Sequence, residues 1–192
     1  MDDDDAKDAL LHELRDARQA LVTQLDGRSE YEVRRPLDPS GTNLLGVVKH
    51  VALWEAYYFG PVFERPVAGL PDWRDDAAVD AHLWAAEHES RAEVVERYEA
   101  AGARSDRAIA ELPLDAPGFV PWWPRPHVTL LAVALHVLSD TVWHGGQTFA
   151  LLERNGGADI GAEPSAHLAE LERIARAMGR SDAGAVSTPR RA

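Results

Sequence analysis

The chain has 192 residues, 45% of them hydrophobic, which is enough for one domain with a full core. Its 20 Lys and Arg residues against 32 Asp and Glu residues give a formal net charge of −12. Nucleic acid is therefore not expected as a partner, because phosphate contacts need a basic face. The absence of cysteine excludes disulfides and thiolate ligands, so any nucleophilic thiol has to come from a substrate.

The N-terminus, MDDDDAKD, is acidic and unlike a signal peptide. No apolar run reaches membrane-spanning length without a charge. We therefore expect a soluble cytoplasmic protein without membrane contact.

Two helices are predicted in the first third of the chain. Apolar residues at spacings of three and four from Leu10 to Leu25 predict an amphipathic helix that ends at Gly27. After the turn cluster LDPSGTN, a helix from about Asn43 to Phe59 is apolar on nearly all sides and should be central in a bundle. Gly46 in this second helix would let a neighbouring helix or a ligand approach closely.

Residues 60–89 form a long Pro- and Gly-rich connection, and connections of this length are often functional. Trp73 and Trp84 in it are candidates for covering the mouth of a site or for anchoring the loop. Ser90 followed by Glu93 is a capping-box signature, which predicts a helix that begins there.

The helix after Ser90 is expected to end before Pro113. Its basic residues, among them Arg97, Arg104 and Arg107, belong to a solvated face or meet an anionic ligand at the bundle rim. Trp122 and Trp123 follow between prolines, so they cannot be helical and should pack over the bundle end.

A long apolar run from about His127 to Arg154 predicts the last bundle helix, and it carries three polar residues at a spacing of four. His136, Asp140 and His144 would project from one face of that helix. Burying two imidazoles and a carboxylate is costly unless they find partners, and a divalent metal suits all three. The plainer alternatives are hydrogen-bonded core histidines or an Asp–His surface pair.

His50, in the middle of the second helix, is by itself best explained as a core histidine that donates to a backbone carbonyl. It stands, however, in the context VKHVALWE and is followed by the pattern H-x3-D-x3-H-x-G-Q from His136 to Gln147. Together these motifs resemble the DinB-like superfamily of small metal-binding four-helix bundles, which includes the mycothiol-dependent maleylpyruvate isomerases and the bacillithiol S-transferases. The resemblance extends from about Leu10 to Arg154, and the passage RRPLDPSGTNLLGVVKH is similar to an actinobacterial branch.

The resemblance implies that His50, Asp140 and His144 hold one divalent metal ion. Zinc is the first candidate, and nickel, manganese or iron would also accept these ligands. The family's common H-R-G-Q run reads HGGQ here, without the Arg, so Gln147 either bonds near the site or only packs. His136 matches a position that is not usually a ligand, which favours a supporting or core role.

The implied activity is that of a metal-dependent S-transferase or isomerase, which uses a low-molecular-weight thiol such as mycothiol on a small electrophile. Two alternatives from other classes stay open, a metal-dependent hydrolase and a non-enzymatic metal-binding stress protein. The sequence identifies neither the electrophile nor the thiol.

The expected fold is all-α: an up-and-down four-helix bundle with a long connection before the third helix and a short C-terminal helix. Residues 1–179 would form one DinB-like domain, and residues 180–192 a disordered C-terminal tail. The apolar stripe of the C-terminal helix, from Leu168 to Met178, would pack on the bundle or form the contact of a homodimer.

Overall fold

The computed structural model describes residues 3–75, 81–155 and 166–185. Their elements in chain order are α1 (Asp3–Thr23), α2 (Glu30–Arg34), α3 (Leu44–Tyr58), the short 3-10 helix η1 (Pro61–Phe63), α5 (Arg91–Glu111), β1 (Pro117–Phe119), β2 (His127–Thr129), α6 (Leu130–Asn155) and α7 (Ala166–Ala185). The all-α class is confirmed, since the two short strands form only a small antiparallel hairpin. In the described part of the chain, no helix is long and apolar enough to cross a membrane.

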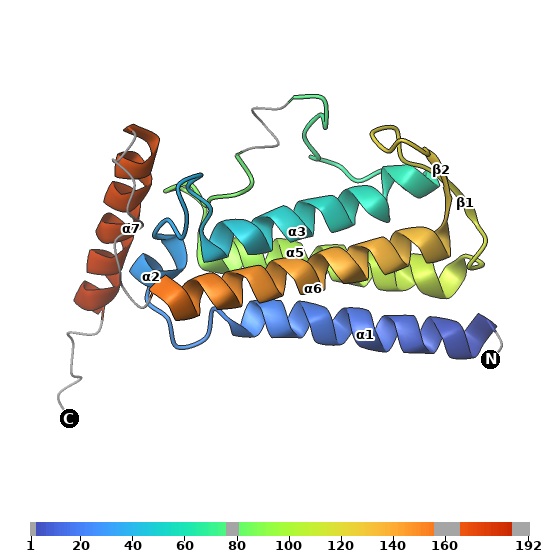
Figure 1. Ribbon diagram of the computed structural model, residues 1–192, viewed down its shortest axis with the longest axis horizontal. Coiled ribbons are helices and arrows are strands. Elements are labelled where there is room, and N and C mark those ends of the chain that lie inside the picture. Colours follow the sequence, from blue (N-terminus) through green and yellow to red (C-terminus); the bar gives the residue numbers. More distant parts are fainter. Residues whose placement is uncertain (1–2, 76–80, 156–165, 186–192) are drawn as a thin grey trace.

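Four long helices, α1, α3, α5 and α6, lie side by side as a bundle, with α6 in view between α3 and α1 (Figure 1). Their directions do not alternate. Lys49, early in α3, pairs with Glu89 just before α5, and Glu55 and Ser105 meet farther along the same two helices, so α3 and α5 are parallel. The order is therefore up, down, down, up, because the long connection after α3 returns the chain to the end from which it came.

The bundle core consists of two apolar clusters along its length. One lies toward the β-hairpin and contains, among others, Leu14, Ile109, Leu130 and Val133. The other lies toward α2 and contains residues such as Leu21, Leu45, Val48 and Tyr98. Between them the helices carry polar side chains, and the candidate site belongs to this middle layer.

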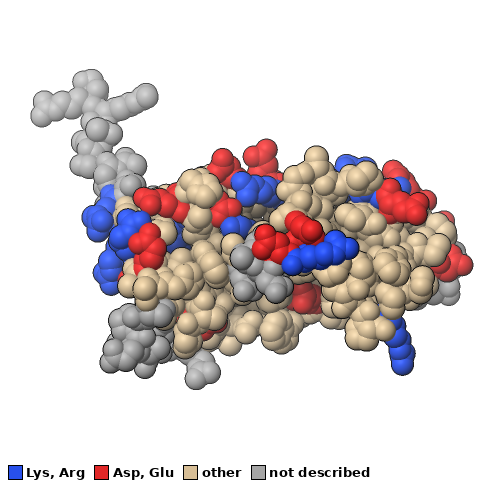
Figure 2. Space-filling view, turned by 90° about the horizontal axis from the view of Figure 1, so that it is seen from above, with Lys and Arg blue, Asp and Glu red and all other residues tan. Residues whose placement is uncertain are grey.

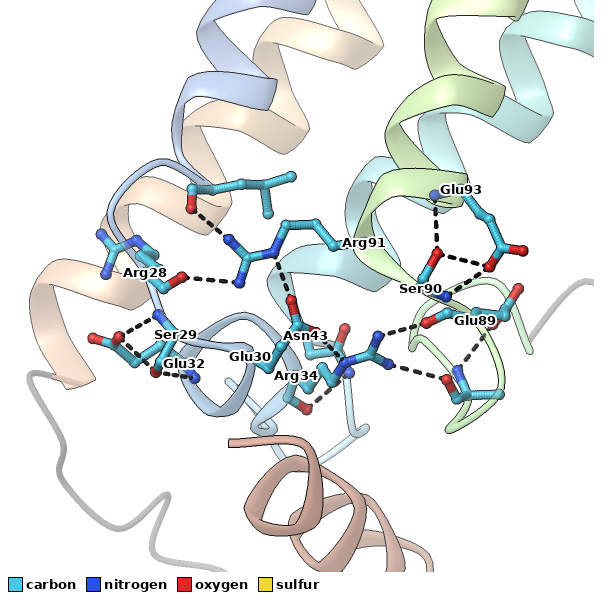
Figure 3. Close-up of polar contacts among 12 residues, drawn as sticks. Arg28, Ser29, Glu30, Glu32, Arg34, Asn43, Glu89, Ser90, Arg91 and Glu93 are labelled. Carbon is cyan, nitrogen blue, oxygen red and sulfur yellow. Dashed lines mark hydrogen bonds and ion pairs between the residues drawn. The ribbon is translucent and has the colours of Figure 1, made fainter. Parts of the chain in front are cut away.

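A junction at the α2 end ties α1, α2 and α5 together, and the sequence did not predict its short helix α2 (Figure 3). Both α2 and α5 begin with a complete capping box, Ser29 with Glu32 and Ser90 with Glu93. The second of these confirms the predicted start of α5. The first was overlooked because it is followed by a helix of only five residues, too short to show a periodic pattern.

Arg34 is the central side chain of this junction and is almost completely buried. Its guanidinium donates to the carbonyl oxygens of Ala86 and Glu89 and pairs with Glu30 at 2.7 Å. Glu30 also pairs with Arg91 at 2.8 Å, so one carboxylate joins α2 to α5 (Figure 3). These bonds fix the end of the long connection against the bundle.

Helix α7 packs on α2 at this end of the bundle (Figure 1). Leu168, Leu171 and Ile174 are buried there, so the chain itself covers most of the stripe that was expected to offer a dimer contact. Helix α7 also continues to Ala185, past the domain boundary predicted at residue 179. Residues 180–185 are therefore helical, and the rest of the predicted tail, 186–192, lies outside the described residues.

Candidate functional site

The imidazoles of His50 on α3 and His144 on α6 meet inside the bundle. Their ring centroids are 4.9 Å apart, edge to face, and His144 is buried. The Nδ1 atom of each ring is buried without a hydrogen-bond partner. A buried histidine normally has its ring nitrogens hydrogen-bonded, so two unsatisfied nitrogens in neighbouring rings suggest that a ligand binds here. The simpler reading of His50 as a core histidine bonded to a carbonyl does not account for this.

Asp140 lies one turn before His144 on α6, as the spacing predicted. Its Oδ1 atom is 3.7 Å from His144 Nε2, and its side chain is 31% exposed. The carboxylate thus lies beside His144 and is partly exposed to solvent. It also supplies the negative charge that a divalent cation would need.

Both histidines are held in the neutral form. Burial, together with the nearby His144 and His82, lowers the pKa of His50 to about 4. Burial also lowers the pKa of His144, which Asp140 opposes in part. At neutral pH each ring therefore has an unprotonated nitrogen, the state in which imidazole binds metal.

His82 is a further histidine near this pair, and no sequence pattern singled it out. It comes from the connection before α5, and both of its ring nitrogens are buried without a hydrogen-bond partner. Burial and the nearby Lys49 lower its pKa to about 4. No spacing rule could have found His82, because it lies in an irregular segment whose path is set by tertiary contacts.

The donor atoms do not form a finished metal site. Among residues 3–75, 81–155 and 166–185, no group of three or more His, Cys, Asp or Glu side chains is arranged to hold a metal ion. His50 and His144 fit such an ion by their chemistry and by their unpartnered nitrogens, and Asp140 lies next to them. Metal binding by these three residues therefore stays a prediction.

His136 and Gln147 lie apart from the histidine pair. The His136 ring packs against Tyr58 and Trp123, with centroids 5.0 and 4.6 Å away, which agrees with a core role. Gln147 is exposed on α6.

An aromatic wall continues from His50 toward the β-hairpin. Trp54, one turn after His50, packs against Trp122 at 5.3 Å, and Trp122 packs against Trp73 at 5.2 Å. The indole nitrogens of Trp122 and Trp123 donate to the Tyr58 hydroxyl at 3.4 and 3.1 Å. The predicted packing of these two tryptophans over the bundle end is confirmed.

Trp73 and Trp84 were predicted to cover the mouth of a site or to anchor the connection. Of these two, only Trp73 reaches the aromatic wall. Trp73 lies on it, and its other neighbour is the guanidinium of Arg74, 4.4 Å above the ring. Trp84 instead packs on His167 of α7 at 4.4 Å and serves as an anchor.

A cavity of about 540 Å³ lies between α3, α5 and the connection. His82 belongs to its lining, whereas His50, Asp140 and His144 do not. Its wall combines apolar residues such as Leu53 and Leu70 with His82, Glu89 and the basic residues Lys49, Arg97 and Arg104. Lys49 donates to two carbonyl groups and to Glu89, so it is committed to the fold. Arg97 and Arg104 are exposed. Figure 2 shows basic and acidic side chains interspersed on the face of the molecule that is seen from above.

A second buried polar group lies deeper in the middle layer. Arg18 pairs with the buried Glu55 at 2.5 Å and with Asp106 at 2.7 Å, and Ser105 bonds to both Arg18 and Glu55. The sequence patterns did not predict this group, because a charged position within an amphipathic helix does not show whether it is buried.

The chain matches the family model described as Mycothiol-S-transferase over residues 9–156. That range includes α3, α5 and α6 in full, most of α1, and each of His50, Asp140 and His144. No curated protein matches the chain. The match covers well over half of the chain, so the chain belongs to the mycothiol-S-transferase family of DinB-like proteins.

Proposed function

We propose that this chain is a divalent-metal-dependent transferase or isomerase that uses a low-molecular-weight thiol, such as mycothiol, on a small electrophile. The observation that carries the proposal is the pair His50 and His144, two neutral imidazoles that face each other with unsatisfied buried nitrogens. Support for the thiol comes from the family, whose description names mycothiol and S-transfer.

His50, His144 and Asp140 would hold the ion, with zinc as the first candidate and nickel, manganese or iron as others. A bound ion would supply a lowered thiol pKa, so that the co-substrate reacts as a thiolate at neutral pH. Since the chain has no cysteine, the sulfur nucleophile is external. This leaves the protein the tasks of binding and orientation.

The chain's own residues would arrange the two substrates. Asp140, whose Oδ1 atom is 3.7 Å from Nε2 of His144, would balance positive charge at the site. Trp54, with its ring centroid 6.3 Å from that of His50, offers an apolar face to an electrophile. The cavity beside His82 has the volume of a small-molecule site. Arg104 in its lining would favour a substrate with negative charge, whereas Arg97 pairs with Glu89 at 3.3 Å.

The first experiment is elemental analysis of protein purified without a chelating tag. We expect one divalent ion per chain in the wild type, and loss of the ion in His50→Ala and His144→Ala with the helical circular dichroism retained. His12→Ala is the matched control, because the His12 side chain is 72% exposed on α1 and pairs with Asp16 on the same helix. Metal retention at wild-type affinity in both site variants would place the ion elsewhere.

The second experiment tests the chemistry. The metal-loaded protein is incubated with mycothiol and a panel of small electrophiles, and thiol adducts or isomerised products are identified by mass spectrometry. Product formation that depends on His50 and His144 supports the transferase or isomerase. Stoichiometric metal without any thiol product would point to the hydrolase or to the non-enzymatic metal-binding protein instead.

A further inference from the structure

The cavity between α3, α5 and the connection combines positive charge with apolar surface. Its lining contains three basic side chains and one acidic side chain, which are Lys49, Arg97, Arg104 and Glu89. This is a local excess of positive charge in a chain whose net charge is −12. The other residues of the lining are mainly apolar. A cavity of about 540 Å³ with such walls has the size of a small-molecule site, and its charge favours an organic anion.

Three of these four charged side chains are bound to one another or to the connection. The ammonium group of Lys49 donates to the carbonyl oxygens of Ala81 and Trp84, at 3.1 and 3.3 Å. It also donates to Glu89 at 2.6 Å, and Glu89 in turn accepts from Arg97 at 3.3 Å. The three hydrogens of the ammonium group are therefore all used, and the carboxylate has two cationic partners.

Arg104 remains free to bind a ligand. It is exposed on α5, and it makes no hydrogen bond or ion pair with any residue that the structure describes. A guanidinium group offers a planar fork of N–H donors, which matches a carboxylate through two parallel hydrogen bonds. Arg104 is therefore the candidate partner for the anionic end of a ligand in this cavity.

His82 and Arg104 lie toward opposite ends of the cavity. The carbonyl groups that flank His82 in the chain bind Lys49, early in α3, and Lys49 and Arg97 share one carboxylate partner. Arg104 follows Arg97 by seven residues, which is about 10 Å along a helix. Because α3 and α5 are parallel, Leu53, one turn after Lys49, lies between the two ends. The cavity therefore suits an elongated ligand.

The His82 ring supplies a polar group at its end of the cavity. The residue belongs to the lining, and both ring nitrogens are buried without a hydrogen-bond partner. Burial and the nearby Lys49 lower its pKa to about 4, so the neutral ring has one N–H donor and one acceptor nitrogen at pH 7. Leaving such groups unpaired costs free energy, and a ligand that bonds to one of them removes part of that cost.

We propose that this cavity binds an elongated monocarboxylate that carries a polar group at its far end. The carboxylate pairs with Arg104, and the apolar chain of the ligand lies along Leu53 and Leu70, which both line the cavity. The polar group bonds to a ring nitrogen of His82. Because both ring nitrogens are buried, the ring turns about its Cβ–Cγ bond when the ligand binds.

The inference names the class of the small electrophile, and in that role it rests on the proposed function. Binding to the cavity does not itself need a metal ion, because none of His50, Asp140 and His144 belongs to the lining. His82 connects the cavity with the histidine pair, since it lies near His50. The end of the ligand that carries the polar group is therefore the end nearest to the pair, and the reactive group of an electrophile is expected there.

Isothermal titration calorimetry with three probes tests the binding. The probe ω-hydroxyoctanoate carries both polar ends, octanoate lacks the hydroxyl group, and α,ω-octanediol lacks the carboxylate. We expect ω-hydroxyoctanoate to bind with the same affinity to the purified wild type and to His144→Ala, the variant that would lose the metal ion. Absence of binding to the wild type would overturn the proposal. Loss of binding in His144→Ala would also overturn it, because the probe would then occupy the histidine pair.

Variants at the two ends of the cavity identify the contacts. Arg104→Gln should weaken binding of both carboxylates about fivefold and leave that of octanediol unchanged, because an exposed ion pair contributes modestly. Its control is Arg107→Gln, exposed on the same helix and outside the lining. His82→Leu should weaken binding of ω-hydroxyoctanoate about fivefold without weakening that of octanoate. Its control is His88→Leu, exposed in the same connection. Circular dichroism checks the fold of each variant, and wild-type affinities in Arg104→Gln would overturn the proposal.

The role of the ligand as a substrate is tested with pairs of electrophiles that differ only in a carboxylate at the end away from the reactive group. With the metal-loaded protein and mycothiol, we expect a lower KM for the carboxylate member of each pair. Arg104→Gln should raise that KM about fivefold and leave kcat unchanged. Thiol products without a preference for carboxylates would overturn this inference alone. Probe binding without any thiol product would refute the proposed function and leave the cavity as a carboxylate site.

Discussion

Gly46 of α3 lies directly against the backbone of Leu83: a β-carbon at position 46 would come within 2.1 Å of the Leu83 carbonyl oxygen. The same oxygen accepts a hydrogen bond from the Asn43 amide at 3.1 Å, and Lys49 bonds to the carbonyl of Ala81. The connection is thus fixed along the first turns of α3. This is the contact that brings His82 close to His50.

Gly46→Ala should therefore destabilise the protein by about 1–3 kcal/mol, because a backbone group, unlike a side chain, cannot move aside freely. The expected measurement is a lower midpoint in guanidinium unfolding. Gly145→Ala on α6 is the matched control, since its β-carbon would meet only Gln24, at 3.7 Å. That variant should be more stable by about 0.5–1 kcal/mol, as for other helical glycines. An equal effect of both changes would contradict the role given to the Leu83 contact.

The Gly46 position illustrates what the sequence could predict. Periodicity and caps were enough to place the four bundle helices, and a glycine within an apolar helix correctly indicated a close approach. The approaching segment is a loop, however, and loops carry no periodic signal. The same limit explains why His82 was overlooked although it lies beside the predicted His50.

Chain direction was the other feature beyond the reach of sequence patterns. A helix has the same periodicity whichever way it runs, so α3 and α5 could not be recognised as parallel from their residues. The buried pair of Arg18 and Glu55 was hidden for a related reason. Arg18 lies in a helix with many other charged residues, and Glu55 shares its helix with Lys49, so neither position stands out in the sequence. Only the packed bundle shows that the two charges meet.

The metal-free protein should lose stability as the pH falls from about 6.5 to about 4. The upper limit is the ordinary pKa of histidine, and the lower limit is the pKa of His50 and His82 in the folded chain. In this window the unfolded chain binds protons that the folded chain excludes, so unfolding is favoured by acid. Each such histidine contributes a slope of at most about 1.4 kcal/mol per pH unit.

Urea unfolding with a chelator present, measured at steps of pH across that window, checks this expectation. His50→Asn removes one histidine that takes up a proton only when the chain unfolds, so the free energy of unfolding should depend less steeply on pH. His12→Asn, on the exposed face of α1, is the control and should keep the wild-type dependence. A steeper dependence in His50→Asn would contradict the argument.

Arg18→Met should destabilise the bundle by about 3–5 kcal/mol, because it leaves the fully buried carboxylate of Glu55 without its cation. Arg15→Met is the control: Arg15 pairs with Asp106 at 2.7 Å, but its side chain is 58% exposed, so its loss should cost less than about 1 kcal/mol. The double variant Arg18→Met with Glu55→Leu should recover much of the loss, since it removes both buried charges. Thermal unfolding of the four proteins compares them, and similar losses for Arg18 and Arg15 would refute a special role for the buried pair.

The last prediction concerns Asp140 and the ion. If Asp140 is a ligand beside His50 and His144, then Asp140→Ala should weaken zinc binding without abolishing it, because both histidines remain. Loss of a residue that only supports a metal ligand typically lowers the affinity by about 10–100-fold. We expect Asp140→Ala to lower the affinity for zinc by at least this factor. Asp140→His should keep metal binding, since a histidine at this position again faces His144 one turn later.

Competition titration with a chromogenic chelator measures the affinity of the wild type and of each variant. Asp140→Asn separates charge from shape, because it keeps the size of the side chain and removes its negative charge. His136→Ala is the matched control on the same helix, as His136 packs against Tyr58 and Trp123 and is not expected to bind the ion. Unchanged affinity in Asp140→Ala together with a loss in His136→Ala would move the third ligand position from Asp140 to His136.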